Sequence, residues 1–193
     1  MALILASTSP IRQQMLRAAG VAFEPMNADV DENQLKAGLD DPVEIAGQLA
    51  EAKAIAVSTR FPEDWVIGSD SVVSVDGRLF DKPRDRQQAA EHLRFFSGKP
   101  MRLTSAVALA HAGNTAWTHV ETASLVVRPL GKEFIETYLN AEWPEVGYCV
   151  GVFRMEGRGV QLFERIEGDH FTILGLPLLA LLGALRERGL LAS

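Results

Sequence analysis

Two charged side chains in the middle of the sequence have types and spacing that suit phosphate chemistry. Asp70 follows an apolar run at 65–67 that predicts a buried strand ending in a small-residue turn. Lys82 follows a hairpin predicted by the Asp-Gly pair at 76–77, and Pro83 favours an extended backbone at this lysine. A carboxylate holds a hard cation through oxygen, and a lysine holds phosphate oxygens as a compact positive charge. The pair indicates a metal-assisted phosphate site, although Gly-x-Asp turns are common in strand-rich proteins.

The start of the chain predicts a second place where an anion could bind. An apolar run at 3–6 is typical of a strand, and a hydroxyl-rich turn follows it. Ser9 suits a helix N-cap, Pro10 suits the first helical position, and Gly20 suits the C-terminal end. Arg12 then lies in the first turn, where backbone N–H groups and the helix dipole also favour negative charge. The alternative is simple helix capping beside a solvated arginine.

Glu32 is the best candidate to act together with Asp70, as a metal ligand or as a base. It lies in a polar segment at 27–33, so the alternative is a solvated loop acid. If the two carboxylates share a cation, the ligands are all oxygen, which predicts Mg²⁺ or Mn²⁺.

Several other chemistries are disfavoured by motifs that the sequence lacks. It has no G-x-x-x-x-G-K-[ST] loop, no G-x-G-x-x-G turn after a strand and no G-x-S-x-G elbow. Its four histidines show no zinc-type spacing. The single cysteine, Cys149, excludes an internal disulfide, and its apolar neighbours predict a buried strand thiol.

Composition narrows the class of protein. The 193 residues are enough for one domain or two small lobes, and 47% of them are hydrophobic. The net charge of −6 argues against a nucleic-acid partner. No signal peptide is evident, and the longest apolar stretch, 173–185, is too short to span a bilayer. That stretch predicts a core helix, and the expected location is the cytoplasm with no membrane partner.

The predicted elements are irregularly alternating helices and strands, which favours an α/β protein with a mixed sheet. One long hairpin is expected, with strands at 103–110 and 116–127 joined by Gly113-Asn114. Further strands are predicted at 3–6, 21–26, 65–67 and 160–166, and helices at 10–20, 41–58, 85–96, 131–140 and 173–185.

An ordered set of short motifs resembles the Maf family of nucleoside triphosphate pyrophosphatases and covers nearly the whole chain, from Leu3 to about Leu190. In the first half of the chain the motifs are Leu-Ala-Ser-x-Ser-Pro-x-Arg at 5–12, Val-Asp-Glu at 30–32, Gly-Ser-Asp-x-Val at 68–72 and Asp-Lys-Pro at 81–83. The later motifs are Ser-Gly-Lys at 97–99, Gly-Arg-Gly at 157–159, Phe-Glu-Arg-Ile-Glu-Gly at 163–168 and Leu-Gly-Leu-Pro-Leu at 174–178.

The resemblance implies a single Maf-like domain over 1–193, with an elongated mixed sheet, flanking helices and two lobes around a central cleft. It implies hydrolysis of a nucleoside triphosphate between the α- and β-phosphates, and it implies that the reaction needs a divalent cation. A homodimer is compatible with it. Because the family name derives from septum formation, the alternative is a nucleotide-binding regulator of cell division without turnover.

The same resemblance implies roles for individual residues. Asp70 matches the general base and metal-associated acid of the family, and Glu32 matches the acid of its Val-Asp-Glu motif. The expected contacts to the triphosphate are Ser7, Ser9, Arg12, Lys53 and Lys82, with Lys82 also counted among the catalytic residues.

Three positions vary with base preference in the family and fall on Ile11, Ser71 and Glu156. Members acting on 7-methylguanosine triphosphate tend to have Trp, Gln and Glu there, and this chain shares only the glutamate. Members of the thymidine and uridine type tend to have Arg, Thr and Gln. The base therefore stays open, with a lean towards a purine or modified base.

Overall fold

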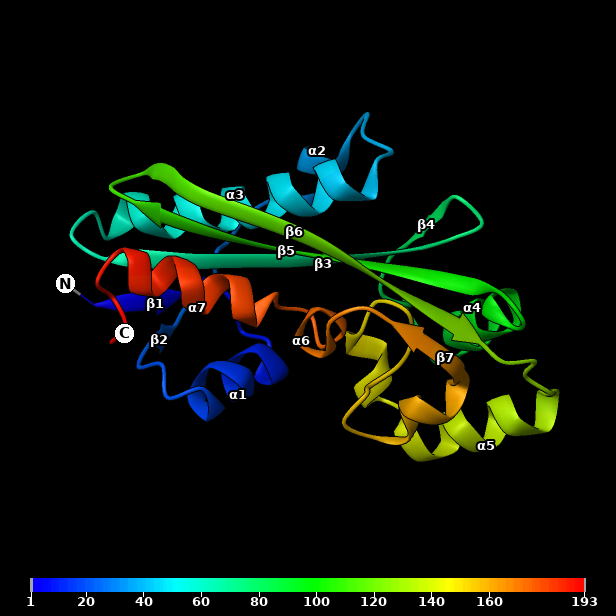
Figure 1. Cartoon of the computed structure of the whole chain (residues 1–193). Helices are drawn as coiled ribbons and strands as arrows, with labels where there is room; N and C mark the ends of the chain where they lie inside the picture. The colour runs from blue at the N-terminus through cyan, green and yellow to red at the C-terminus, as the bar shows by residue number, and fades with distance from the viewer. Residues whose placement is uncertain (1, 193) are drawn as a thin grey trace. The chain divides into compact units, whose positions relative to one another are not determined.

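A seven-stranded mixed sheet forms the centre of the fold in the computed structural model, which describes residues 2–192 (Figure 1). The strand order is β2-β1-β3-β5-β6-β7, and β4 pairs with β3. β1 is parallel to β2 and β3, whereas the β3–β4 and β6–β7 pairs are antiparallel. The predicted α/β class with a mixed sheet is confirmed. The strands are β1 (Leu3–Leu5), β2 (Glu24–Pro25), β3 (Trp65–Val75), β4 (Arg78–Phe80), β5 (Pro100–His111), β6 (Asn114–Val127) and β7 (Phe163–Glu167).

The helices flank this sheet, and several of them begin at a residue whose side chain caps the helix, whereas Ser9 at the start of α1 makes no such side-chain bond. Asp41 and Asp85 accept backbone N–H bonds at the starts of α3 and α4, as their sequence positions predict. The helices are α1 (Pro10–Ala18), α2 (Glu32–Lys36), α3 (Pro42–Arg60), α4 (Arg86–Phe96), α5 (Lys132–Glu142), α6 (His170–Ile173) and α7 (Leu178–Glu187), with 3₁₀ turns at Glu145–Tyr148 and Arg158–Leu162. Within residues 2–192, no helix is long and apolar enough to cross a membrane.

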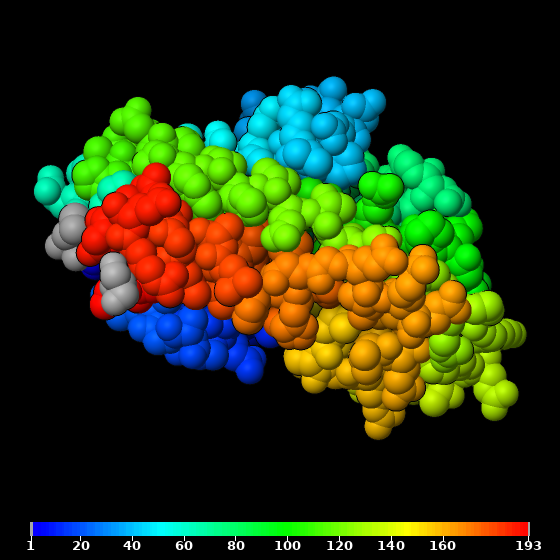
Figure 2. Space-filling model, in the orientation of Figure 1, coloured from blue at the N-terminus to red at the C-terminus, as the bar shows by residue number. Residues whose placement is uncertain are grey.

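The chain divides into two compact units. Unit 1 contains the residues up to Ser71, then Thr104–Glu121, then Asp169 onward. Its core on one face of the sheet is built from α1, α7 and the strands between them, including Leu16, Ile67 and Leu185. α3 covers the other face with residues such as Leu49 and Ala54 (Figure 1). In the space-filling view α7 and α1 form a continuous surface (Figure 2).

Unit 2 consists of Val72–Leu103 and Thr122–Gly168. An aromatic cluster packs α4 against the β3–β4 hairpin, with the Phe80 and Phe96 ring centroids 4.7 Å apart. α5 joins α4 through an ion pair of 2.9 Å between Arg86 and Glu136. This unit therefore has its own apolar centre.

Several predicted element boundaries are wrong. The segment 173–185 is not one helix, because Pro177 lacks an N–H and Gly175 has a φ of 99°, so α6 ends and α7 begins after this loop. The strand predicted at 160–166 starts only at Phe163. At Gly159 a side chain would overlap the backbone of Arg154, so the chain turns too tightly there for a strand. The strand predicted at 21–26 shortens to β2.

Cys149 also differs from its predicted setting. It ends the first 3₁₀ turn instead of lying in a strand, and its thiol lies 3.8 Å from the carbonyl oxygen of Glu145. Burial raises the pKa of the Cys149 thiol to about 11. The thiol is therefore protonated near neutral pH, which argues against a nucleophilic role.

Candidate active site

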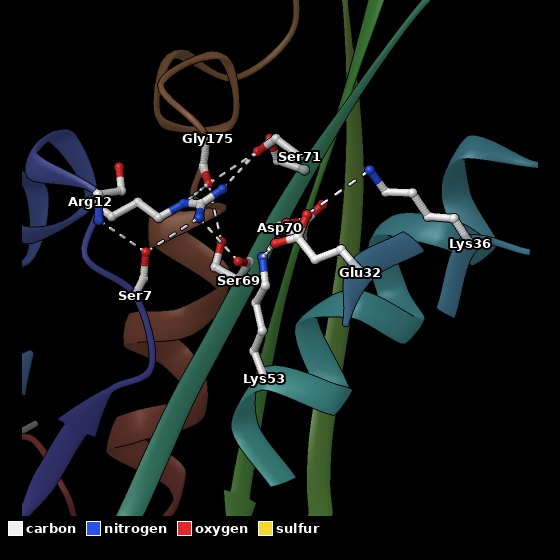
Figure 3. Close-up of polar contacts among 11 residues, drawn as sticks. Ser7, Arg12, Glu32, Lys36, Lys53, Ser69, Asp70, Ser71 and Gly175 are labelled. Atoms are coloured by element: carbon white, nitrogen blue, oxygen red, sulfur yellow. Dashed lines mark hydrogen bonds and ion pairs between the residues drawn. The ribbon is translucent and has the colours of Figure 1, made fainter. Parts of the chain in front are cut away.

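The sequence Gly68-Ser69-Asp70-Ser71 lies inside β3 instead of forming the predicted turn. Side chains of a strand alternate between faces, so Gly68 and Asp70 meet α3, while Ser69 and Ser71 meet Arg12 on the other face (Figure 3). The strand can continue through these polar residues because each of their side chains finds a partner. One strand thus presents polar groups on both of its faces.

Gly68 sets the distance between β3 and α3. A Cβ atom at this position would overlap the carbonyl oxygen of Ala50 and lie 2.7 Å from the backbone nitrogen of Ala54. Only glycine allows so close an approach of helix and strand. The approach brings Lys53, on the same turn of α3, within reach of the next side chain on that face of the strand, Asp70.

Lys53 bridges two carboxylates in this region (Figure 3). Its Nζ lies 2.6 Å from Asp70 Oδ1 and 2.6 Å from Glu32 Oε1. The side chains of Lys53 and Asp70 are only 12% and 11% exposed, whereas Glu32 is 43% exposed. Lys36, one helical turn after Glu32, lies 4.0 Å from Glu32 Oε2. The candidate metal or base pair is therefore brought together around one ammonium group.

Glu32 reaches Lys53 because it begins a short helix and does not lie in the expected loop. Asp31 caps α2 by accepting hydrogen bonds from the backbone nitrogens of Asn33 and Gln34, both at 3.1 Å. The two acids of the Val-Asp-Glu motif thus have different structural roles. Asp31 holds the helix end, and Glu32 contacts the lysine.

Arg12 lies on the opposite face of β3 and joins three separate segments (Figure 3). Its Nε donates to the carbonyl oxygen of Gly175 at 2.9 Å, and Nη1 donates to that of Ser69 at 3.0 Å. Nη1 also lies 3.5 Å from Ser7 Oγ, and Nη2 donates to Ser71 Oγ at 3.1 Å. Burial lowers the pKa of the Arg12 guanidinium, while Asp70 and Glu32 act in the opposite direction. Arg12 thus ties the loop between α6 and α7 to the strand that carries Asp70.

A chain of hydroxyl groups continues from Arg12 into the interior of unit 1. Ser105 Oγ donates to the carbonyl oxygen of Thr172 at 2.9 Å and lies 2.9 Å from Ser71 Oγ, where either hydroxyl can be the donor. Ser71 Oγ also lies 3.4 Å from the carbonyl oxygen of Gly175, which can accept its proton. Thr172 Oγ1 in turn donates to Glu121 Oε2 at 2.7 Å. The hydroxyl of Ser71, one of the predicted base-reading positions, therefore has its partners inside the protein.

Replacing Arg12 by methionine should destabilise unit 1, because the carbonyl groups of Ser69 and Gly175 would lose a charged donor. We expect a loss on the order of 3 kcal/mol in the free energy of unfolding, measured by urea titration. The control is Arg17→Met, in the same helix but exposed and bonded to Gln13, which should cost about 1 kcal/mol or less. Equal effects for both variants would contradict this role of Arg12.

The other predicted site residues are placed as follows. Ser7 Oγ accepts from the backbone nitrogen of Ser9 at 3.2 Å, and Ser9 is the N-cap residue of α1. Ile11 is partly buried against the core of unit 1. Lys82 and Glu156 belong to unit 2, where both are exposed. Glu156 Oε1 lies 3.2 Å from Arg154 Nε.

Sequence reasoning did not single out Ser69, Gly175, Ser105, Thr172 or Glu121 as parts of this network. Gly175 offered a signal, because a Gly-x-Pro sequence inside an apolar run marks a loop. Ser105 and Thr172 offered none, since single hydroxyl residues in apolar segments carry no indication of their partners.

A profile of the Maf family, described as "Maf-like protein", matches residues 2–188. The chain belongs to the Maf family. This Maf chain is 49% identical over 191 residues to a protein of Rhizobium etli named "7-methyl-GTP pyrophosphatase", with 97% of this chain and 96% of that protein covered. It is also 49% identical over 192 residues to a protein of Nitrobacter hamburgensis named "Nucleoside triphosphate pyrophosphatase", with coverage of 98% and 95%.

Among solved structures, the Ham1 protein of Staphylococcus aureus resembles this Maf chain with a TM-score of 0.50. The sequences are 12% identical, and the match covers 94% of this chain and 98% of that one. At this identity the likeness shows the fold alone. The predicted family and the predicted fold class are both confirmed.

Proposed function

We propose that this Maf chain is a nucleoside triphosphate pyrophosphatase, which cleaves between the α- and β-phosphates and yields a monophosphate and pyrophosphate. The observation that carries the proposal is the cluster of Asp70, Lys53 and Glu32 in unit 1. It combines carboxylates with a cation in a chain whose relatives are named "7-methyl-GTP pyrophosphatase" and "Nucleoside triphosphate pyrophosphatase".

A divalent cation fits the carboxylate pair. Both oxygens lie 2.6 Å from one Nζ, so they are separated by no more than twice that distance and could approach a shared ion. Within residues 2–192, no three His, Cys, Asp or Glu side chains gather in a way that could hold a metal. Mg²⁺ suits such a site, because it is usually bound by one or two carboxylates with phosphates and water as further ligands. When bound, the ion would neutralise charge on the phosphates.

We assign the other catalytic and binding roles to residues of the chain itself. Asp70, mostly buried and fixed on β3, would orient and deprotonate the attacking water. Lys53 and Lys82 would hold phosphate oxygens and stabilise the charge that builds on the leaving pyrophosphate. Arg12, Ser7 and Ser9, which lie on the other side of β3 from Asp70, would make further contacts to the triphosphate. The proposal treats the whole chain, 1–193, as a single Maf-like domain.

The test is the identity of the released product. We expect a panel of nucleoside triphosphates with Mg²⁺ or Mn²⁺ to give a monophosphate and pyrophosphate in equal amounts, measured by ³¹P NMR without an added pyrophosphatase. Removing the metal with a chelator should abolish the reaction. Release of orthophosphate with no pyrophosphate formed first would contradict the proposal.

Which base the substrate carries is a separate and more specific proposal. We favour a purine or modified base because Glu156 offers acceptors to N–H groups on a base edge. Ile11 and Ser71 are the other two positions proposed to affect the preference. We also propose that the enzyme acts in the cytoplasm without a nucleic-acid or membrane partner, in keeping with its net charge of −6, and that it forms a homodimer.

Replacing Glu156 by glutamine should change the ratios of kcat/KM among the triphosphates. The average kcat/KM over all of them should change little. The shape is kept and the charge is lost, so the preference should shift by roughly 1–3 kcal/mol between bases. The measurement is kcat/KM across the panel. Glu164→Gln, an exposed change on β7 of the same unit, should leave every ratio unchanged. A uniform change for Glu156→Gln would show that this residue does not read the base.

A further inference from the structure

The position between Asp70 and Glu32 that a divalent ion would need is taken by the ammonium group of Lys53. We propose that Lys53 is an exchangeable internal cation. It holds the two carboxylates together before the metal binds, leaves when the metal arrives, and then contacts the phosphates. This inference rests on the metal site of the proposed function.

The contacts of Lys53 support such an exchange. Its Nζ lies 2.6 Å from an oxygen of each acid, and its side chain is 12% exposed, so both carboxylates are oriented towards one buried point. A divalent ion bound to both acids would lie within a few ångströms of the ammonium group. Two like charges at that distance repel strongly in a partly buried site. The ammonium group and the ion therefore cannot both occupy the point.

The lysine can move without disturbing the fold. Its backbone is fixed by the close packing of α3 against Gly68, whereas its charge lies at the end of a flexible four-carbon stem. Other cations nearby are less suited to the exchange. Lys36 lies 4.0 Å from Glu32, and the N–H groups of Arg12 are bonded to Gly175, Ser69 and Ser71 on the opposite face of β3.

The exchange couples metal and nucleotide. A triphosphate offers the displaced ammonium group new anionic partners, so it should favour metal binding. By linkage, the metal should favour triphosphate binding by the same factor. A monophosphate, with fewer anionic oxygens, should produce a weaker coupling.

The experiment is a Mn²⁺ titration of the nucleotide-free protein, followed by electron paramagnetic resonance of the free ion. Lys53→Met removes the competing charge and keeps a flexible, unbranched side chain that is one atom shorter. We expect it to bind Mn²⁺ about tenfold or more tightly than the wild type. Lys36→Met also removes one positive charge near Glu32, but not the contact with Asp70, and we expect a gain of about threefold or less. Equal or weaker binding by Lys53→Met would overturn the inference.

A second measurement covers the case in which Lys53→Met fails to fold. Acetylation of the wild-type protein is followed by mass spectrometry of its peptides with and without saturating Mn²⁺. Lys53 should react several times faster with the ion, whereas exposed Lys132 should react at the same rate in both conditions. An unchanged rate at Lys53 under saturating Mn²⁺ would overturn the exchange.

Both measurements are independent of turnover. Pyrophosphate release by a wild type that shows no exchange would overturn only this inference. Tighter Mn²⁺ binding by Lys53→Met in a chain that releases only orthophosphate would support the exchange and overturn the proposed function.

Discussion

An Asp70→Asn variant should fold like the wild type and lose on the order of 10²–10⁴-fold in kcat. Asparagine has the same shape, so the strand and its neighbours can stay in place. It cannot accept a proton, and it offers a metal ion no negative charge. The measurement is kcat for pyrophosphate release, with circular dichroism as the check on folding.

The matched control for this variant is Asp31→Asn. Asp31 neighbours Glu32, but its carboxylate caps α2, and asparagine caps a helix about equally well. Activity should therefore stay close to that of the wild type. If Asp70→Asn also kept a near-normal kcat, the base would have to lie elsewhere, and Glu32 would be the first residue to test.

A Gly68→Ala variant should lose about 3 kcal/mol or more in the free energy of unfolding. The new methyl group would overlap the carbonyl oxygen of Ala50 and crowd the backbone of Ala54. Both are backbone groups in the middle of α3, so neither can turn aside as a side-chain tip would. Relief requires the helix to move away from β3, which would carry Lys53 away from Asp70. We expect a lower urea midpoint together with a large loss of activity.

Gly47→Ala is the control for this variant in the same helix. A methyl group there would meet Val120 Cγ2 at 3.6 Å, an ordinary contact. Alanine also favours helix over glycine by up to about 1 kcal/mol, so this change should be neutral or stabilising. Similar unfolding midpoints for the two variants would contradict the close packing at Gly68.

Local signals allowed much of the fold to be predicted. The hairpin at Asp76 and Gly77 is confirmed, and both residues have positive φ values, 52° and 73°, as this two-residue turn requires. Gly20, with a φ of 73°, follows the end of α1 as predicted. Each of these features is decided by a few neighbouring residues, so the sequence was sufficient.

The errors arose where distant parts of the chain decide the local structure. The turn predicted at 68–70 is wrong, because the polar side chains there are satisfied by Lys53 and by groups beyond residue 100. A segment rich in Gly, Ser and Asp is typical of a turn, and the sequence does not show that distant residues will bind its polar side chains. The single helix at 173–185 was wrong for a related reason. Its apolar pattern hid a loop whose carbonyl oxygen binds Arg12.

In the candidate site, too, some residues could be predicted from the sequence and others could not. Residue type and family motifs predict Asp70, Glu32 and Lys53 as site residues, and the structure brings all three together. Their roles stay predictions. The hydroxyl chain through Ser105 and Thr172 was not foreseen, because its members are single polar residues in apolar segments that meet only in the folded chain.

The bond between Arg12 and Gly175 has a consequence for how the protein is made. The two residues are 163 positions apart in sequence, so the ribosome completes nearly all of the chain between making the donor and making its acceptor. During that time β1 and α1 have emerged but lack the loop that anchors them. The N-terminal half of the site can therefore reach its final form only late in translation. A nascent chain halted before Gly175 would leave it open to chaperones and proteases.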